Sequence, residues 1–414
     1  GLLLTVLCLS GVVNGAEYDL EGEKIYFWQW VDYLAQFEEG GDYEGRLAEL
    51  EEKYNFEMVK KEFPPNKTEQ FMARLMAEDS TNDIWLMRSY AIPHLASKGA
   101  LRPIGDLLPK NIYENAPGIY KNLANKYSYK GKQYGYIFNI PYPRLSYFVA
   151  FRKDMFERAG LKSLYEVYNN GNWDWDKFLE VAKKLTKDTD GDGKIDQYGL
   201  ATNPKSFIHL TNGASRIELE DGKLVYSLND SEAVKAFEFG RKLITQAKFK
   251  NTTWRNGNAG MKIQSLFRLN DWSQDYEWGA VPLPKGPDID HNPFISLPYS
   301  GSVLALPSNS KYPAAIIQIL SELWNPSEQA ERIKNNIKEI AQDQKMAKIL
   351  LEGFERATVP KYVRTNVLGS IRHSHNNPLG EAVWKILSGK KTAKSALDEI
   401  APAAQKELDD LFNE

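Results

Sequence analysis

Cysteine is almost absent from this chain of 414 residues. The single cysteine, Cys8, lies in the first sixteen residues, so residues 17–414 can form no disulfide and offer no cysteine nucleophile. A protein built from residues 17–414 could cross an oxidising compartment without any disulfide chemistry. Of all residues 42% are hydrophobic and 26% are charged, which is the composition of an ordinary soluble globular protein.

Histidine is also scarce, and the common catalytic motifs are absent from the sequence. The chain has five histidines, and two of them, His373 and His375, stand in the polar stretch RHSHNN, which is more typical of a surface segment than of a zinc site. The motifs HExxH, G-x-S-x-G, G-x-x-x-x-G-K-[ST] and G-x-G-x-x-G do not occur. A glycoside hydrolase needs only two carboxylates, so the sequence leaves that class of enzyme open as an alternative.

A dominant charge of either sign is missing as well. The 52 lysines and arginines nearly balance the 55 aspartates and glutamates, which gives a formal net charge of -3. A phosphate backbone requires a broad positive surface, and no basic run in this chain carries interleaved aromatic residues. The sequence therefore predicts no nucleic-acid partner.

The first sixteen residues differ from everything that follows them. Gly1–Val13 is uncharged and largely apolar, and small residues and the polar stretch EYDLEGEK come after it. This pattern is typical of the hydrophobic part of a secretory signal peptide, and cleavage after Gly15 or Ala16 would leave a small residue at the cut. We therefore expect residues 1–16 to be removed and the protein to act in the periplasm or at the cell surface. The residues TVL before Cys8 match a lipoprotein signal poorly, so release is favoured over a lipid anchor.

The length exceeds the roughly 250 to 300 residues that one hydrophobic core usually serves, so two lobes are expected. Strand and helix patterns alternate, which is typical of an α/β sheet with parallel strands. In the amino-terminal part the predicted strands are 24–30, 56–63 and 83–87, and the predicted helices are 43–54 and 71–77. The later predicted strands are 146–151, 303–306 and one near Val281, with helices at 154–159, 175–185, 312–324, 327–351 and from 379 onward.

Several sequence segments occur in an order that is typical of one protein family. Between Tyr147 and Leu200 they are YFVAFRKDMFERAGL and NWDWDKFLEVAKKLTKDTDGDGKIDQYGL. Further along they are GNAGMKIQSLF, WGAVPLPKGPD, SGSVLALPSNSKYPAAIIQILSELW and SGKKTAKSALDEIAPAAQKELDDL. Together they resemble the family 1 extracellular solute-binding proteins of ABC importers, the class that includes maltose-binding protein. The resemblance covers nearly all of residues 17–414, but Ile263-Gln264-Ser265 stands where the family has a glycine-rich pocket strand.

The resemblance implies a two-lobed periplasmic-binding-protein-like α/β fold, with a ligand cleft between the lobes and a hinge of several crossovers. By this analogy the amino-terminal lobe consists of residues 17–143 plus 303–345, and the carboxy-terminal lobe of residues 144–302 plus 346–414. The implied function is capture of a sugar or oligosaccharide without chemistry, with membrane permease subunits as partners of a monomeric binding protein. A glycan-active enzyme and a ligand sensor for a receptor stay open as alternatives.

A saccharide offers flat C–H faces edged by hydroxyls, so aromatic rings and forked charged groups near strand ends are candidate binding residues. In the amino-terminal lobe these candidates are Trp28, Gln29, Trp30, Asp32, Arg88 and Tyr90. Trp28 and Trp30 share one face of a strand, so both could belong to the core instead. Arg88 follows the apolar strand IWLM, where a guanidinium can fork onto two hydroxyls or a carboxylate.

The remaining candidates lie near the crossovers and in later loops. They are Tyr142 and Arg144 at the first crossover, Trp254 and Arg255 in the loop NTTWRNGNAG, Trp272, and Tyr299 and Ser300 at the second crossover. Trp254 is favoured for ligand stacking, because an exposed tryptophan in a polar loop has little structural reason to be there. Tyr142 stands between Pro141 and Pro143, which restrict the backbone, and its ring could simply pack the hinge.

The tryptophans at 173 and 175 are predicted to be core residues. Asp174 can cap the helix that begins at Trp175, and the apolar residues of that helix recur at helical spacing.

Besides the candidate sugar-binding residues, the sequence contains a candidate metal site. The spacing D-x-D-x-D-G-x-x-D matches the first nine positions of an EF-hand calcium loop. Its oxygen donors are Asp188, Asp190, Asp192, the Lys194 carbonyl and Asp196. Gly199 replaces the bidentate glutamate of position twelve, so Gln197 or water would complete the shell at lower affinity. A turn without metal is the alternative, but clustered aspartates would repel one another. We therefore expect one structural calcium ion.

Calcium is predicted to stabilise the carboxy-terminal lobe, because the helix at 175–185 runs directly into the acidic loop. The resemblance implies that this loop lies away from the cleft, so the ion should not touch the sugar. Chelation should then lower the melting temperature while sugar affinity changes little. Calorimetry of the wild type and of an Asp190→Ala, Asp192→Ala double variant, each with calcium or with chelator, measures this. An equal melting temperature in all four samples would contradict the site.

Overall fold

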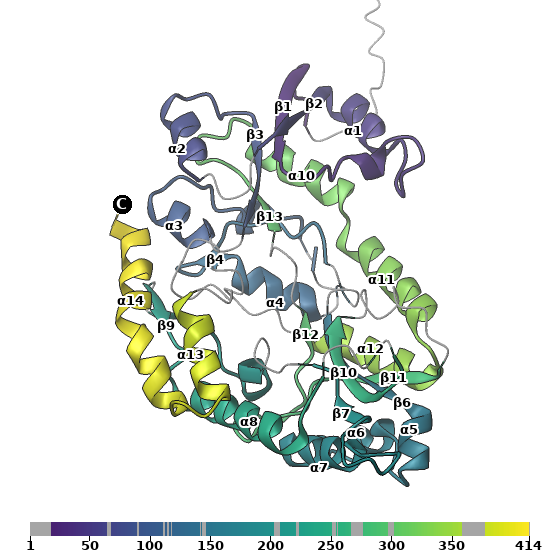
Figure 1. Ribbon diagram of the computed structural model, residues 1–414. Coiled ribbons are helices and arrows are strands. Elements are labelled where there is room, and N and C mark those ends of the chain that lie inside the picture. Colours follow the sequence, from purple (N-terminus) through teal and green to yellow (C-terminus); the bar gives the residue numbers. More distant parts are fainter. Residues whose placement is uncertain are drawn as a thin grey trace, which may run out of the picture.

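Two sheets with helices packed on them form the upper and lower halves of the computed structural model (Figure 1). The structure describes residues 18–63, 68–88, 91–110, 112–113, 116, 118–140, 142, 146–202, 208–220, 223–250, 254, 256–265, 276–296, 302–357 and 377–413. We call the halves the first lobe and the second lobe. They confirm the predicted two-lobed α/β fold, and the exact residues at which the lobes divide stay a prediction.

The first lobe is built on a four-stranded sheet in the order β13-β3-β1-β2. Its elements are β1 (Glu23–Gln29), η1 (Ala35–Phe37), α1 (Arg46–Tyr54), β2 (Phe56–Glu62), α2 (Thr68–Met76), β3 (Asp83–Arg88), α3 (Ala91–Ser97), η2 (Gly105–Leu107), α4 (Gly118–Lys126), β4 (Ser128–Tyr129), β5 (Lys132–Gln133), β13 (Ser302–Ala305) and α10 (Pro313–Leu323). Strands β1, β2 and β3 are parallel, as predicted, and β13 runs antiparallel along β3.

Both faces of this sheet are covered by helices. Successive side chains of a strand point to opposite faces, so Ile84 and Leu86 of β3 enter a core shared with α1 and α10. Trp85 and Met87 enter a second core, which includes Phe71 of α2 and the apolar residues of α3. The continuous apolar run IWLM is therefore explained by burial on both sides.

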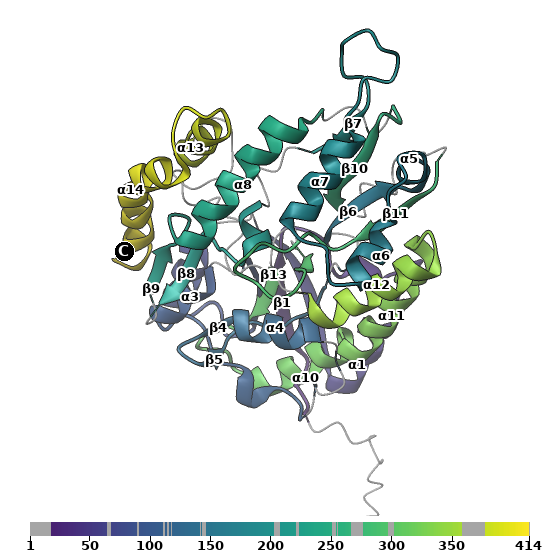
Figure 2. The ribbon, with the colours of Figure 1, turned by 90° about the horizontal axis from the view of Figure 1, so that it is seen from below.

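The second lobe contains a sheet in the order β11-β6-β10-β7, with β12 also paired to β6. Its elements are β6 (Ser146–Arg152), α5 (Lys153–Arg158), α6 (Leu164–Asn169), α7 (Trp175–Leu185), β7 (Tyr198–Leu200), η4 (Ile208–Asn212), β8 (Ile217–Glu220), β9 (Lys223–Tyr226), α8 (Ser231–Ala247), β10 (Ala259–Ser265), β11 (Trp278–Val281) and β12 (Ile295–Ser296). Helix α7 packs on β7 and β10 and lies beside α8 (Figure 2).

The tryptophans at 173 and 175 are core residues, as predicted. Trp173 has no exposed surface, and the ring of Trp175 stacks on Phe239 of α8 with 4.5 Å between the centroids. Asp174 caps α7 by accepting a hydrogen bond from the backbone N–H of Lys177 at 2.9 Å. The sequence therefore predicted both the start of this helix and its buried face.

The chain ends in four helices, α11 (Pro326–Ile340), α12 (Gln344–Arg356), α13 (Pro378–Leu387) and α14 (Ala393–Asn413). The prediction of one helix at 327–351 is wrong, because α11 stops at Ile340 and Asp343 caps α12 by accepting from Met346 N at 2.7 Å. The same carboxylate pairs with Lys153 of the second lobe at 2.8 Å. No proline or glycine marks the break, so helical periodicity could not show it. Among the helices of the described residues, none is long and apolar enough to cross a membrane.

Two crossovers run between the lobes and are fixed at both ends by strand pairing. In the first lobe Tyr136 forms an antiparallel bridge with Leu304. In the second lobe Ser296 of β12 pairs with Ser146 of β6. The two connections therefore leave the first lobe side by side and enter the second lobe side by side.

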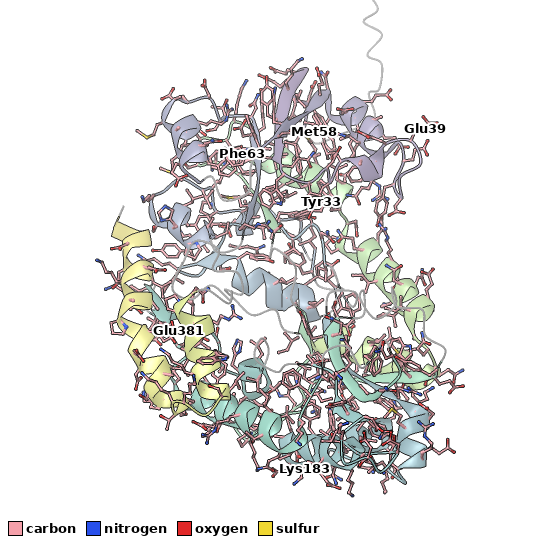
Figure 3. All side chains as sticks on the ribbon, in the orientation of Figure 1. Tyr33, Glu39, Met58, Phe63, Lys183 and Glu381 are labelled. Carbon is pink, nitrogen blue, oxygen red and sulfur yellow. The ribbon has the colours of Figure 1, made fainter. Side chains whose placement is uncertain are left out.

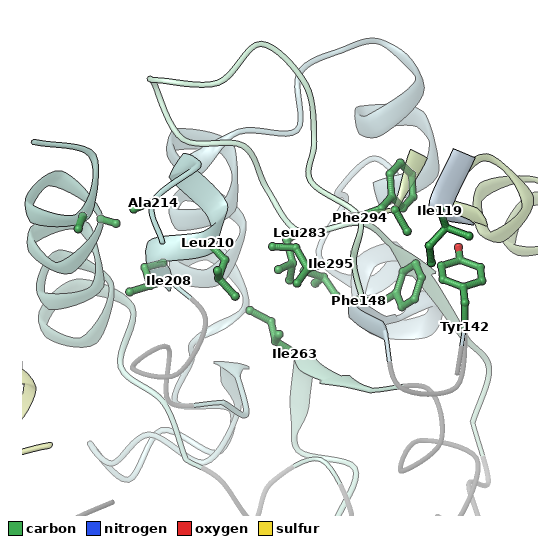
Figure 4. Packing of buried hydrophobic residues seen from close by; sticks show 14 of the residues in the cluster. Ile119, Tyr142, Phe148, Ile208, Leu210, Ala214, Ile263, Leu283, Phe294 and Ile295 are labelled. Carbon is green, nitrogen blue, oxygen red and sulfur yellow. The ribbon is translucent and has the colours of Figure 1, made fainter. Parts of the chain in front are cut away.

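Apolar contacts also join the lobes beside the crossovers. Figure 4 shows Ile119 of α4 and Tyr142 of the first crossover next to Phe148 of β6 and Phe294 of the second lobe. The helices α4 and α12 approach so closely that only a glycine fits at position 118. A Cβ added there would lie 2.1 Å from the carbonyl oxygen of Glu355.

Gly199 of β7 has no room for a side chain. A Cβ there would lie 1.9 Å from the carbonyl oxygen of Ala182 in α7. Gly199→Ala should therefore lower the free energy of unfolding by about 1–3 kcal/mol, the usual cost of overpacking. Gly105→Ala is the matched control, because its Cβ would meet only the Cβ of Gln133 at 3.8 Å. It should change stability by less than about 0.5 kcal/mol. Equal denaturation midpoints for the two variants would contradict this packing.

Candidate functional site

In each sheet, several strands begin or end on the side that lies next to the crossovers. We call this side the edge of that lobe. In the first lobe β1 and β3 end at this edge, and β13 begins there with Ser302 paired to Arg88. In the second lobe β6 begins at Ser146, and β10 ends at Ser265, which pairs with Tyr147. Ligands of α/β sheets bind outside the carboxyl ends of the parallel strands. The two edges therefore bound the candidate site.

An aromatic ring and a guanidinium group meet at the first-lobe edge. The guanidinium carbon of Arg88 lies 4.5 Å from the ring centroid of Trp30, and both residues are half-buried. Because β1 ends at Gln29, Trp30 lies past the strand and packs against the core that contains Phe27. Trp28 packs against the other core, so the predicted sharing of one face by the two tryptophans is wrong. Trp30 and Arg88 are two predicted binding residues that the structure brings into contact.

Trp28 takes part in the packing of the first lobe. The guanidinium of Arg74 lies 4.4 Å from its ring centroid, and the ring meets Phe63 edge to face at 6.1 Å. Arg74 also pairs with the fully buried carboxylate of Asp83, with 2.9 Å between Nε and Oδ2. The indole N–H of Trp85 donates to the same oxygen at 3.0 Å. These contacts give Trp28 a structural role.

Gln29 and Asp32 shape the turn that follows β1. Gln29 is 5% exposed, its amide nitrogen donates to Asp32 Oδ1 at 3.1 Å, and its amide oxygen accepts from Tyr33 N at 2.9 Å. Asp32 Oδ1 also accepts from Leu34 N at 3.1 Å, and Oδ2 pairs with Lys60 at 2.8 Å. Burial opposes ionisation of Asp32, but its hydrogen bond and ion pair with Lys60 hold its pKa below the usual value. Both predicted binding residues therefore have partners within the first lobe.

Tyr33 is a residue of this edge that the sequence did not reveal. It lies on the side of the first lobe that faces the second lobe (Figure 3). Its ring meets Phe138 edge to face at 4.8 Å. Burial raises the pKa of Tyr33, whereas the positive charge of Arg88 opposes this rise. Only its position just past the end of β1 could have pointed to it.

A cavity of about 460 Å³ lies between the loop after β1, the first crossover and α11. Two predicted binding residues, Asp32 and Tyr142, contribute to its lining. Tyr142 is only 2% exposed, its ring stacks on Phe354 of α12 at 5.4 Å, and its hydroxyl donates to the carbonyl of Leu350. These contacts favour the packing alternative for Tyr142. A larger hollow of about 880 Å³ lies between α7 and α8 and contains none of the predicted ligand-binding residues.

The expectation of an exposed Trp254 is wrong. Trp254 has no exposed surface, because its ring meets Tyr276 edge to face at 5.7 Å and belongs to the main core. Its carbonyl also accepts a hydrogen bond from the Tyr276 hydroxyl at 2.7 Å. A fully buried ring offers no face to a sugar. The other predicted binding residues lie outside the described residues; these are Tyr90, Arg144, Arg255, Trp272, Tyr299 and Ser300.

The acidic loop after α7 projects from the second lobe (Figure 2). Carboxylate oxygens of Asp188, Asp190 and Asp196 lie within 4.8 Å of one another. The Asp188 carboxylate accepts hydrogen bonds from Gly193 N and Gly191 N, both at 2.7 Å, and these bonds lower its pKa. Three carboxylates that converge in this way form a donor set that suits a hard cation with oxygen ligands.

The remaining predicted ligands of the loop are less convergent. The Asp192 carboxylate accepts from Lys194 N at 2.8 Å and lies 3.4 Å from the Lys194 ammonium group. The amide nitrogen of Gln197 donates to the carbonyl of Leu185 at 2.8 Å, which ties Gln197 to the end of α7. Position twelve is Gly199, where α7 leaves no space for any side chain. Packing therefore explains why the glutamate of a complete calcium loop is absent.

The fold agrees with that of known proteins. A family model described as "Bacterial extracellular solute-binding protein" matches residues 48–330 of this chain. The chain therefore belongs to this family of extracellular solute-binding proteins.

Solved structures of binding proteins share the fold. One is a cyclo/maltodextrin-binding protein complexed with maltotetraose. The alignment covers 93% of this chain and 97% of that protein, at 17% identity and a TM-score of 0.64. An extracellular solute-binding protein from Staphylococcus aureus in complex with maltose covers 94% of this chain and 98% of its own, at 15% identity and a TM-score of 0.65.

One curated relative has a different ligand in its name. A putrescine/cadaverine-binding protein of Pseudomonas aeruginosa is 25% identical over 160 residues, which are 39% of this chain. The match spans only 40% of the length of that relative.

The two tryptophans near the end of β1 should respond differently to replacement by phenylalanine. Trp28→Phe should lower the free energy of unfolding by about 1–2 kcal/mol, because the stacked Arg74 loses its better ring, and should leave ligand binding unchanged. Trp30→Phe should weaken ligand binding roughly three- to tenfold with a smaller loss of stability. Chemical denaturation and calorimetric titration measure the two effects. The opposite pattern would contradict the assignment of roles.

Proposed function

We propose that this protein is the substrate-binding component of an ABC importer and captures a sugar or short oligosaccharide between its lobes. The Trp30–Arg88 pair at the first-lobe edge, in a member of the extracellular solute-binding family, is the observation that carries the proposal. Permease subunits in the membrane are its partners, and it acts outside the cytoplasm as a monomer.

The chemistry of the edge suits a saccharide. The C–H face of a sugar ring packs on an aromatic ring, and a guanidinium group can fork onto two hydroxyls or onto a carboxylate. Asn139, an exposed amide that lines the same cavity as Tyr33, adds a neutral donor and acceptor. Maltotetraose and maltose in the solved structures of similar fold support an oligosaccharide as the first ligand to test.

A polyamine is the second candidate ligand, because the curated relative is named for putrescine and cadaverine. A diamine carries two positive charges and needs carboxylates to bind them. At the first-lobe edge Arg88 contributes a positive charge, and the carboxylate of Asp32 is already paired with Lys60 at 2.8 Å. These charges support a saccharide over a polyamine.

We also propose that the ligand leaves the protein unchanged. A glycan-active enzyme would release product, whereas a binding protein would not, and a ligand sensor would differ from an importer component only in its partner. The absence of the common hydrolase and nucleotide-binding motifs from the sequence supports the binding protein.

The acidic loop carries a separate proposal. We propose that Asp188, Asp190 and Asp196, with the carbonyl of Lys194, hold a structural calcium ion. The convergence of the three carboxylates within 4.8 Å supports this. The loop follows α7 directly, so the ion would tie the end of this helix to the beginning of β7.

Titration with maltotetraose, a uronic-acid disaccharide and putrescine tests the proposed function. A saccharide should bind and, at about one hundred times its dissociation constant, should add about 2.7 kcal/mol to the stability of the folded protein. Putrescine should produce no such shift, and no cleaved saccharide should appear over multiple turnovers. Small-angle scattering should detect a more compact protein with the bound sugar. Binding of putrescine alone, or steady release of product, would contradict the proposal.

A further inference from the structure

Two buried N–H donors at the first-lobe cavity of about 460 Å³ have no hydrogen-bond partner among the described residues. They are the indole N–H of Trp324, directly after α10, and the side-chain amide nitrogen of Gln329 in α11. Both residues line the cavity. Buried polar groups almost always have a partner, so two such donors at one cavity call for an acceptor within it.

The ring of Trp324 is held in place by three phenylalanine rings. It stacks on Phe27 with 5.9 Å between the centroids. It meets Phe37 and Phe138 edge to face, at 5.2 and 5.4 Å. Trp324 is only 3% exposed, and these neighbouring rings carry no oxygen that could accept its N–H. The position of this donor is therefore fixed, and its packing partners cannot satisfy it.

One side of α11 forms a wall of the cavity. Four of the lining residues recur at helical spacing and so lie on the same side of the helix; these are Gln329, Arg332, Ile333 and Asn336. The hydroxyl of Tyr120 donates to Gln329 Oε1 at 3.3 Å, so the amide nitrogen is the atom that is left without a partner. Asn336, two turns further along, adds a second amide. The wall therefore offers neutral hydrogen-bonding groups.

The charged groups of the lining are already paired. Arg332 pairs with Asp42, and Asp32 pairs with Lys60 at 2.8 Å. An ion that leaves water for a cavity needs an opposite charge to compensate for its lost hydration. Because each of these charges already has its partner, the lining favours a neutral ligand over an ionic one.

Aromatic rings form much of the remaining lining; they belong to Tyr33, Tyr43, Phe138 and Tyr142. The flat C–H face of a sugar or cyclic polyol packs on such rings. Its hydroxyls can accept from the two unpartnered N–H donors and donate to amide oxygens. The cavity volume lies within the range of small-molecule sites, about 300–1,000 Å³.

We propose that this cavity is a second binding site, which holds one ring of a neutral sugar or cyclic polyol through hydrogen bonds from Trp324 and Gln329. The site is separate from the Trp30–Arg88 pair, because neither of those residues lines the cavity. The proposal does not rest on the proposed function, since the donors, the paired charges and the rings belong to the cavity alone. A free ring and the terminal ring of an oligosaccharide share this chemistry.

Nuclear magnetic resonance of the tryptophan indole groups tests the site directly. The chain has ten tryptophans, and Trp324→Phe and Trp30→Phe each remove one indole resonance and so assign it. D-Glucose, myo-inositol and maltotetraose are the neutral probes, which distinguish a free ring from a terminal one. The Trp324 resonance should move with at least one of them, because its N–H gains an acceptor. Putrescine and glucuronate should leave it in place.

Gln329→Met tests the second donor with a matched control. It removes the amide at nearly constant length and should weaken binding of the neutral probe, read at Trp324, about three- to tenfold, as expected for one lost hydrogen bond. Gln318→Met makes the same change in α10, outside the cavity, at an amide that already donates to Glu322 Oε1 at 2.8 Å. It should bind the probe as the wild type does.

The Trp30 resonance separates this site from the proposed function. Movement of Trp30 alone would support the proposed function and refute the cavity site, whereas movement of Trp324 alone would support only the cavity site. In Trp30→Phe, the affinity read at Trp324 should equal that of the wild type; an equal loss at both positions would mean a single site. A Trp324 resonance that moves with no neutral probe, or an unchanged affinity in Gln329→Met, would overturn the proposal and leave water as the partner of the two donors.

Discussion

The lobes are joined by connections whose ends are fixed by strand pairing. Tyr136 with Leu304 fixes them in the first lobe, and Ser146 with Ser296 fixes them in the second. A paired strand cannot slip by one residue without turning its side chains to the other face, so the span of each connection is set. Any rotation of one lobe against the other must pivot between these pairs. The candidate site lies where the two sheet edges meet this pivot.

A third connection between the lobes is the short break between α11 and α12. Its two ends are fixed by side-chain ion pairs rather than by strand pairing. Helix α11 is held to the first lobe by an ion pair of 2.7 Å between Arg46 and Glu328, whereas Asp343 at the start of α12 is held to Lys153 of the second lobe. The break between the helices thus coincides with the change of lobe. Tyr142, stacked on Phe354 of α12, ties the first crossover to this third connection.

The order of strands and helices could be predicted from the sequence, because hydrophobic periodicity reports which face of each element is buried. The buried stripe of α7 and the two-sided burial of IWLM are examples. The sequence could not show that β1 stops at Gln29, which separates Trp28 from Trp30, since both residues are compatible with a strand. It also could not show that Tyr276 and the core enclose Trp254, because Tyr276 lies 22 residues further along the chain and no local periodicity links the two rings. Tyr33 was missed because Phe138, on which its ring packs, is distant in sequence.

The antiparallel position of β13 along β3 determines the order in which the chain can fold. Strand β3 ends at Arg88, but the strand that pairs with its far side begins only at Ser302, after the whole second-lobe sheet has been made. Until then this side of β3 is an unpaired edge of the first sheet, and unpaired edges template aggregation. Contacts between residues so far apart also slow folding, because a long loop must close first. The sheet of the first lobe is therefore completed only after the sheet of the second lobe has been synthesised, although most of its residues come first in the chain.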